Sequence, residues 1–290
     1  MTPLIHPTAT ISTSASIAPG AVVGAHSVIG ADSRLDTYAV VGPYTELGAR
    51  NHVHAFAVVG GPAQERRTPA DGAFRLRCGD DNIFREGVTV SRGTEKGGGE
   101  TLIGDHVLLM ARSHVAHDCR LGDHITLANG VSLGGHVVVG DRVTFGGHAA
   151  VHQFCRIGTL AFIAANGMIS RDVPPYCLAA GDRATLRGLN VTGLRRAGFE
   201  PDTRRVLARA YRALLRAPRR LGADLDAARN APCEAVRILA AFLQTSERGV
   251  MRALRSVPRD RWQPCDRGVK SEASGTFSTP ETEALRDREG

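Results

Sequence analysis

The sequence has few aromatic residues, no closely paired cysteines and no long apolar run. Aromatic residues make up 5% of the 290-residue chain, whereas Gly contributes 33 residues, a balance that suits thin repetitive coils. The six cysteines include no CxxC pair. We therefore expect thiols that fill the core in a reducing compartment, and neither disulfides nor metal sites built on cysteine.

No stretch approaches the roughly 20 apolar residues that cross a bilayer. Met1 is followed within a few residues by the first repeat, without the pattern of a signal peptide. The sequence therefore predicts a cytoplasmic protein without stable membrane insertion.

The chain carries a net charge of +7, and its arginines gather in two places. One group lies between residues 66 and 92, and nine arginines lie between Arg195 and Arg220. Such groups can be a solvated surface or a docking face for an acidic partner or anionic substrate. Nucleic acid is disfavoured because no stacking aromatic residues are interleaved with the charges.

An apolar residue recurs at every sixth position. The series covers ten positions from Ile5 to Val59 and twelve from Ile103 to Ile169 without a miss. A period of six fits neither a helix of 3.6 residues per turn nor a two-residue strand alternation, and it is typical of a hexapeptide parallel β-helix. Three hexads form one coil, so residues eighteen apart should stack about 4.8 Å from each other.

The organisation predicted from these patterns has three parts. Residues 1–190 form the β-helix, interrupted by loops near 61–77 and 94–101 that should leave the stack on one face. Residues 191–256 form a helical domain, with one helix starting at Pro201-Asp202 and another over 232–247. The polar segment 257–290 is predicted to be a disordered tail.

Histidines gather in the second half of the repeats. Six lie within 39 residues, and none occupies an inward position of its hexad: His114, His117, His124, His136, His148 and His152. Asp118 is eighteen residues before His136, which should place a carboxylate beside imidazoles. Outward histidines could bind zinc across a subunit boundary or supply one general base. We expect no metal and no cofactor, because direct transfer by a general base is the simplest chemistry.

Several motifs in this order resemble the UDP-N-acetylglucosamine O-acyltransferase family, which catalyses the first step of lipid A biosynthesis. They are HVAHDC, SLGGH, AVHQFC, RDVPPY, GLNVTGLRRAGF and the SRGT…GGG loop, and the resemblance extends to about residue 252. It implies a left-handed parallel β-helix with a small C-terminal helical domain. It also implies a homotrimer with active sites between subunits, an acyl carrier protein as partner and a UDP-sugar as substrate.

The resemblance assigns roles residue by residue. His117 is the general base for the sugar 3-hydroxyl, Asp118 orients it, and the Gly135 N–H is the oxyanion donor. Because adjacent strand residues point to opposite faces, the contact between His117 and Asp118 requires a coil corner. The implied substrate-binding residues are Glu65, Arg67, His114, His136, His152, Gln153, Asn190 and Arg196. The donor would be an (R)-3-hydroxyacyl chain on acyl carrier protein, and the implied acyl-chain ruler is Ala165, with Phe162 nearby.

Some positions depart from the better-known members of the family. These members have Lys at Arg67, Asp at Glu65, His at Ser91, Glu at Thr192, Arg at Ala197 and Gly at Ala165. The first five lie near the nucleotide sugar, so N-acylation of the 3-amino analogue of UDP-N-acetylglucosamine is an alternative. Ala165 predicts a shorter acyl chain.

Alternatives outside this reaction are a γ-class carbonic anhydrase-like zinc protein and a non-catalytic hexapeptide trimer. A related N-acyltransferase is disfavoured because it carries an additional N-terminal domain, which we do not expect here because hexads begin at Ile5.

Overall fold

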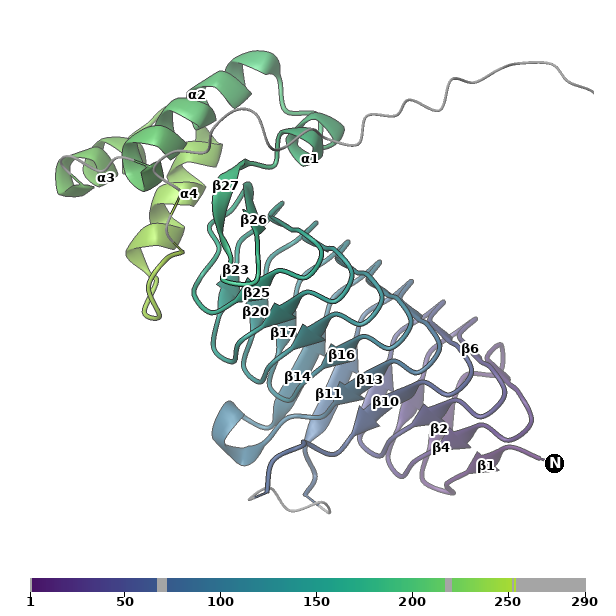
Figure 1. Cartoon of the computed structure of the whole chain (residues 1–290). Coiled ribbons are helices and arrows are strands. Elements are labelled where there is room, and N and C mark those ends of the chain that lie inside the picture. The colour runs from purple at the N-terminus through teal and green to yellow at the C-terminus, as the bar shows by residue number, and fades with distance from the viewer. Residues whose placement is uncertain (1, 67–71, 217–220, 252, 254–290) are drawn as a thin grey trace, which may run out of the picture. The chain divides into compact units, whose positions relative to one another are not determined.

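The computed structural model describes residues 2–66, 72–216, 221–251 and 253 (Figure 1). Arg67 and the predicted tail 257–290 lie outside the described residues.

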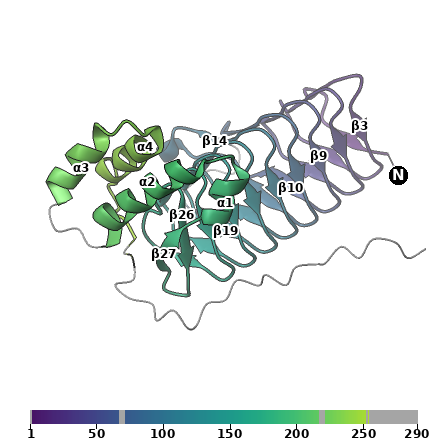
Figure 2. The same cartoon turned by 90° about the horizontal axis from the view of Figure 1, so that it is seen from above.

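The strands form three sheets that are parallel except for the last strand, and successive strands along the repeats belong to the three sheets in rotation (Figures 1 and 2). Sheet A contains β1 (Leu4–Ile5), β4 (Val22–Val23), β7 (Val40–Val41), β10 (Val58–Gly61), β13 (Thr89–Ser91), β16 (His114–Val115), β19 (Ser132–Leu133), β22 (Ala150–Val151) and β25 (Met168–Ile169). Sheet B contains β2 (Thr10–Ile11), β5 (Val28–Ile29), β8 (Thr45–Leu47), β11 (Arg75–Cys78), β14 (Glu100–Ile103), β17 (Arg120–Leu121), β20 (Val138–Val139) and β23 (Arg156–Ile157). Sheet C contains β3 (Ser16–Ile17), β6 (Arg34–Leu35), β9 (His52–Val53), β12 (Ile83–Phe84), β15 (Leu108–Leu109), β18 (Thr126–Leu127), β21 (Thr144–Phe145), β24 (Phe162–Ile163), β26 (Cys177–Ala180) and β27 (Thr185–Leu189).

The predicted eighteen-residue coil is confirmed by the strand register. Val22 pairs with Val40 and Val23 with Val41, and Leu127 pairs with Phe145 in the second run of hexads. The inward residues of these pairs form one core, in which Leu127 and Phe145 are both 0% exposed. Ile5 is 42% exposed, because a residue of the first coil has a neighbouring coil on one side only.

The coils turn sharply at residues with left-handed backbone conformation. Asp118, His136 and Phe154 occur at one corner with φ of 60°, 60° and 64°. Such a φ costs a non-glycine residue about 1–2 kcal/mol. Hydrogen bonds to the preceding coil offset part of this cost, since the His136 N–H donates to the His117 carbonyl at 3.0 Å and the Phe154 N–H to the Gly135 carbonyl at 3.0 Å.

Both repeat interruptions leave the stack at the same corner, where sheet A turns into sheet B (Figure 1). We call this edge the A–B corner. The first loop connects β10 to β11, and the second, with the 3₁₀ helix η1 (Glu95–Gly97), connects β13 to β14. The expectation that the insertions share one face is confirmed.

Helices follow the last strands and pack beside β27 (Figure 2). They are α1 (Val191–Arg196), α2 (Pro201–Tyr211), the π-helical segment η2 (Arg212–Arg216), α3 (Leu221–Arg229) and α4 (Glu234–Gln244). Pro201 is in the first turn of α2, as predicted, and α4 is shorter than the predicted 232–247. Leu207, Val236 and Leu239 pack in one cluster with Leu160 and Tyr176 of the last coils.

Two features near this end were not predicted from the sequence. Strand β26 continues sheet C in parallel with β24, but β27 returns antiparallel to β26. Helices α1 and α3 have 6 and 9 residues, which is too short for a helical stripe to be distinguished by its period. Within the described part of the chain, no helix combines the length and apolar character needed to cross a membrane.

Candidate active site

His117 and Asp118 form a buried hydrogen-bonded pair at the A–B corner. The His117 Nδ1–H donates to the Asp118 Oδ2 at 2.8 Å, and the two side chains are 15% and 1% exposed. The left-handed φ of Asp118 turns its carboxylate towards the side chain of the preceding residue. The expectation that this contact requires a coil corner is confirmed.

The Asp118 carboxylate is fixed by the second loop. The Thr94 N–H donates to Oδ1 at 2.8 Å, and the Thr94 hydroxyl donates to Oδ2 at 2.6 Å. The Asp118 N–H donates to the Thr101 hydroxyl at 2.8 Å. The two donors of Thr94 satisfy a buried charge that would otherwise be costly. Neither threonine was predicted, because Thr94 lies on the loop and Thr101 lies at the start of β14 directly after it, where the hexad count gives no register.

Two glycines make room for this pair. A Cβ at Gly135 would lie 2.7 Å from Cε1 and 2.9 Å from Nε2 of His117, so the imidazole rests directly on the Gly135 backbone. A Cβ at Gly97 would lie 1.9 Å from Cγ of Asp118. Among the described residues, the Gly135 N–H has no hydrogen-bond acceptor. A backbone donor beside the imidazole is therefore available to a ligand.

His136 lies one coil beyond Asp118, as the eighteen-residue spacing predicted. Its Nε2 is 3.7 Å from Oδ2 of Asp118, and its ring stands edge-on to His117 at 5.2 Å between centroids. Phe154, a further coil along, stacks on the other side of His136 at 4.5 Å. Burial lowers the pKa of His136, while the Asp118 carboxylate acts in the opposite direction.

His114 is on β16, three residues before His117. Its Nδ1 forms a hydrogen bond of 2.8 Å with the Thr89 hydroxyl. Burial lowers the pKa of His114, and the nearby His117 acts in the same direction. Burial thus favours the neutral imidazole of both His114 and His136 by lowering the pKa of each.

The other predicted residues of this corner lie around the pair. His152 and Gln153 follow β22 at the A–B corner, and the His152 Nδ1 contacts Nη2 of Arg248 at 2.8 Å. Glu65, on the first loop, is 3.7 Å from the Lys96 Nζ on the second loop, and its charge acts on His136. Phe154 and Arg248 were not predicted, although Phe154 could have been found eighteen residues after His136.

The structure separates two of the six clustered histidines from the others. His124 lies between sheets B and C and stacks on His106 at 4.7 Å. His148 lies where sheet C turns into sheet A, an edge that we call the C–A corner. The interpretation of all six histidines as one site is therefore wrong for a single chain. Consecutive hexads of a coil end at different corners, so only some of the histidines share the A–B corner.

Four further predicted residues lie away from the A–B corner. Ala165 is exposed at the C–A corner, and Phe162 is on β24 in sheet C. Asn190 caps α1 by accepting from the Gly193 N–H at 2.9 Å, and its Nδ2 donates to the Leu160 carbonyl at 3.0 Å. Arg196 is exposed in the last turn of α1.

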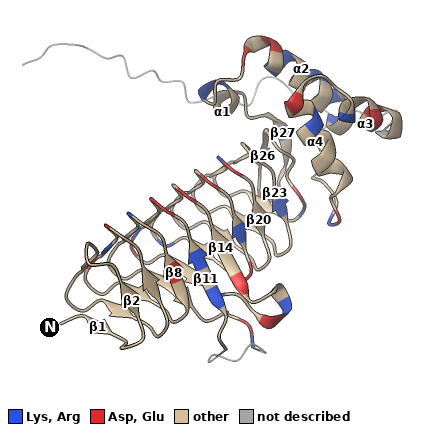
Figure 3. Ribbon diagram, turned by 180° about the vertical axis from the view of Figure 1, so that it is seen from behind, with Lys and Arg blue, Asp and Glu red and all other residues tan. Residues whose placement is uncertain are grey.

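The two arginine groups differ in their surroundings (Figure 3). In the first group, Arg75 and Arg77 on β11 pair with Glu46 on β8 at 3.9 and 3.2 Å, and Arg77 pairs with Glu100 on β14 at 3.0 Å. Arg92 is 3% exposed. In the second group, six arginines are exposed on α1, α2 and η2: Arg195, Arg196, Arg205, Arg209, Arg212 and Arg216. The arginines of the second group, which lie on the helices, are therefore the more exposed of the two groups.

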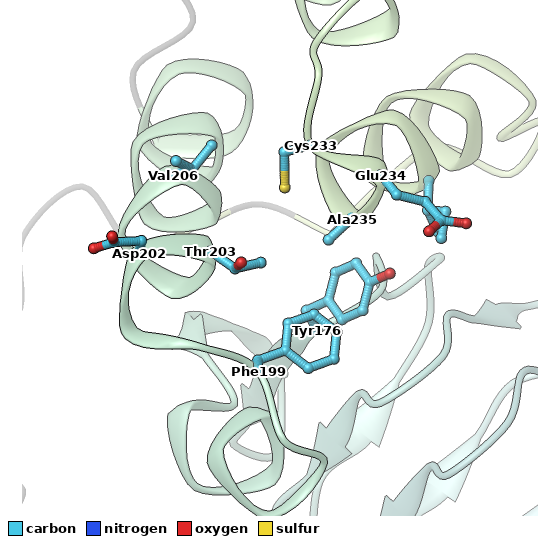
Figure 4. Close-up of a pocket in the computed structure, with 9 residues that line it drawn as sticks. Tyr176, Phe199, Asp202, Thr203, Val206, Cys233, Glu234 and Ala235 are labelled. Carbon is cyan, nitrogen blue, oxygen red and sulfur yellow. The ribbon is translucent and has the colours of Figure 1, made fainter.

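A separate hollow of about 450 Å³ lies among the helices (Figure 4). Tyr176 and Phe199 face into it, with Val206 of α2 and Cys233 and Ala235 at the start of α4. It contains none of the predicted site residues. Burial raises the pKa of Tyr176 to about 12, so its hydroxyl is neutral.

Two groups of side chains in the described ranges have metal-ligating atoms within 4.8 Å of one another. One is His117, Asp118 and His136, and the other is Asp36, His52 and His54. In the first group Thr94 donates to both carboxylate oxygens, so the carboxylate is already satisfied by protein donors.

Comparison with known proteins relates the chain to one family. A family model described as UDP-N-acetylglucosamine O-acyltransferase, domain 2, matches residues 172–251. A second model, described as bacterial transferase hexapeptide (six repeats), matches residues 100–135. The acyl-[acyl-carrier-protein]–UDP-N-acetylglucosamine O-acyltransferase of Syntrophobacter fumaroxidans is 42% identical over 257 residues, which cover 86% of this chain and 99% of that protein. The protein of the same name from Alkalilimnicola ehrlichii is 44% identical over 180 residues, covering 61% and 70%.

Solved structures agree with these relatives. The UDP-N-acetylglucosamine O-acyltransferase from Moraxella catarrhalis has a TM-score of 0.83 at 36% identity, with 87% of this chain and 98% of that chain covered. The UDP-N-acetylglucosamine acyltransferase of Francisella novicida has a TM-score of 0.82 at 32% identity, covering 86% and 92%. These likenesses confirm the predicted left-handed parallel β-helix with a small helical C-terminal part.

The contact between Gly97 and Asp118 gives a prediction about stability. In Gly97→Ala, the new methyl group must displace either the loop or the carboxylate, which breaks the hydrogen bonds from Thr94. We expect the free energy of unfolding to fall by about 1–3 kcal/mol, the usual cost of an unsatisfied buried group. Chemical denaturation measures this change.

Gly147→Ala is the matched control, because the nearest atom to its added Cβ would be the Asn129 carbonyl oxygen at 3.5 Å. This control should change the free energy of unfolding by less than about 0.5 kcal/mol. Equal effects of the two substitutions would contradict the proposed tight packing of the loop on Asp118.

Proposed function

The chain belongs to the UDP-N-acetylglucosamine O-acyltransferase family, and on this premise we propose how its residues carry out the reaction. The chain transfers an (R)-3-hydroxyacyl group from acyl carrier protein to the 3-hydroxyl of UDP-N-acetylglucosamine, the first step of lipid A biosynthesis. The observation that carries this proposal is the buried His117–Asp118 pair, with the imidazole resting on Gly135. It brings a general base, its orienting carboxylate and a backbone donor to one point.

The base acts through Nε2. Because Nδ1–H donates to the Asp118 carboxylate, the lone pair is on Nε2 and accepts the proton of the sugar 3-hydroxyl. The sugar oxygen attacks the thioester carbonyl, and the Gly135 N–H donates to the oxyanion of the tetrahedral intermediate. The intermediate then collapses, the C–S bond breaks, and the imidazolium returns its proton to the departing thiolate of the carrier protein.

Transfer is direct, without an acyl-enzyme. The thiols nearest in sequence to the pair and its neighbours are Cys119 and Cys155, both 0% exposed. Burial raises the pKa of Cys119 to about 12 and that of Cys155 to about 11. A buried neutral thiol is a poor nucleophile, so the sugar oxygen is the attacking group.

A homotrimer completes the site. His117 lies at the A–B corner and Ala165 at the C–A corner, so the base and the proposed acyl-chain ruler lie at opposite edges of sheet A within one chain. If a neighbouring subunit packs its C–A corner against the A–B corner of this subunit, the neighbour's copy of the ruler position and this subunit's His117 lie along one cleft. Asn190, which caps α1, and Arg196 in the last turn of α1 would contact the nucleotide in that cleft, as would Arg67.

The acyl carrier protein docks on the helices. Carrier proteins of this class are acidic, and the exposed arginines of α1, α2 and η2 give a complementary surface that favours association. With this partner and this substrate, the proposed place of action is the cytoplasm.

Removal of the base gives the direct test. We expect the wild-type protein to form the 3-O-acyl product from 3-hydroxyacyl carrier protein and UDP-N-acetylglucosamine. His117→Ala should lose about 10²–10⁴-fold in turnover, the usual contribution of a general base, with little change in binding of the nucleotide sugar. Product formation is followed by mass spectrometry, and binding by calorimetry.

His124→Ala is the control, because His124 lies at another corner of the coil. Near-wild-type turnover of His117→Ala would remove His117 from the role of base.

When the 3-amino analogue of the sugar competes with UDP-N-acetylglucosamine in this assay, a strong preference for the amine would assign the N-acylation suggested by Ser91 and Thr192.

Ala165→Gly tests the ruler. If the terminal methylene of the acyl chain meets the Ala165 methyl group, this overlap costs roughly 1–3 kcal/mol, which is about 10–200-fold in discrimination between chain lengths. We expect the variant to accept longer 3-hydroxyacyl donors, with unchanged affinity for the nucleotide sugar. A donor series of increasing length measures the shift, and an unchanged preference would move the ruler to Phe162.

A further inference from the structure

Four potential metal ligands lie together at the C–A corner, on coils before the second loop. Asp36 follows β6, His52 is on β9, His54 follows β9, and Glu86 follows β12. These strands are neighbours in sheet C, so the group spans three successive coils. None of the four residues belongs to the proposed acyl-transfer site.

The distances between their donor atoms match those of a metal site. The His52 Nε2 is 2.9 Å from the Asp36 Oδ2, and the His54 Nδ1 is 3.3 Å from the same oxygen. The Glu86 Oε1 is 3.7 Å from the His54 Nδ1. In a tetrahedral site with metal–ligand bonds of about 2.0–2.1 Å, ligand atoms are about 3.3–3.4 Å apart. Small side-chain movements would give this spacing.

The Asp36 carboxylate is arranged for such a role. Its Oδ1 accepts from the Arg34 Nε at 2.8 Å, which leaves Oδ2 facing only the two histidines among the described residues. At Asp118, by contrast, Thr94 donates to both oxygens. The Arg34 contact therefore fixes the carboxylate from outside, as partners of metal ligands commonly do.

The histidines are also suitable ligands. Their ring centroids are 3.8 Å apart with 26° between the ring planes, and both rings rotate when their nitrogens turn to one ion. Asp36, His52 and His54 are only 20%, 30% and 21% exposed, so the group is partly shielded from water.

We propose that Asp36, His52 and His54 bind a Zn²⁺ ion. Two imidazoles and a carboxylate are a common donor set for zinc. Glu86 is placed to occupy the fourth position when its side chain turns from Arg85. The ion links the coils of β6, β9 and β12 at the C–A corner, on coils that precede those of His117 and Ala165.

Zinc titration of the full-length protein tests this site. We expect one Zn²⁺ per chain, measured by competition with a chromogenic zinc indicator. Asp36→Asn and His54→Ala should each weaken zinc binding by at least about 10–100-fold, the usual cost of losing a residue that only supports a metal ligand. Asp36→Asn retains the side-chain shape, so its effect does not depend on a change in folding.

Two controls locate the ion. His106→Ala removes an exposed imidazole from another corner and should leave zinc affinity unchanged. His136→Ala removes an imidazole from the group around Asp118 and should also leave it unchanged. The proposal is overturned if the wild-type protein binds no stoichiometric zinc, if His54→Ala binds it as tightly as wild type, or if only His136→Ala loses it.

Discussion

The buried carboxylate of Asp118 is the interaction on which the candidate site depends. It accepts hydrogen bonds from Thr94 on the second loop and from His117 on its own coil, and it lies 3.7 Å from His136 on the next coil. One charge thus fixes a loop, orients the base and faces a second imidazole. A buried carboxylate must have such partners to be tolerated, so the requirement for stability and the geometry of the site coincide.

The corner conformation makes this arrangement possible. A left-handed residue turns the chain between two sheets, so adjacent side chains such as His117 and Asp118 can meet. Stacking then repeats the corner every eighteen residues, which aligns Asp118, His136 and Phe154 along one edge. Both insertions leave at this edge. The rigid core fixes the side chains, and the loops supply the hydrogen-bonding partners.

Much of this could be predicted from the sequence, because a repeat converts sequence spacing into spatial spacing. The hexads predicted the coil, its register and the position of His136 near Asp118. Counting around the eighteen-residue coil would also have separated His124 and His148 from the A–B corner. Thr94 could not be found in this way, because the inserted loop has no fixed register with the coils. The antiparallel β26–β27 pair follows the last hexads, where the period no longer applies.

The most direct test of the role of Asp118 is the tautomer of the His117 imidazole. If Asp118 orients the base, the neutral imidazole carries its proton on Nδ1 and leaves Nε2 free to accept the sugar proton. Nitrogen-15 NMR of histidine-labelled protein distinguishes the two ring nitrogens, and comparison with His117→Gln assigns the signals. We expect a protonated Nδ1 and an unprotonated Nε2 in the wild-type protein. A proton on Nε2 of the neutral ring would contradict it.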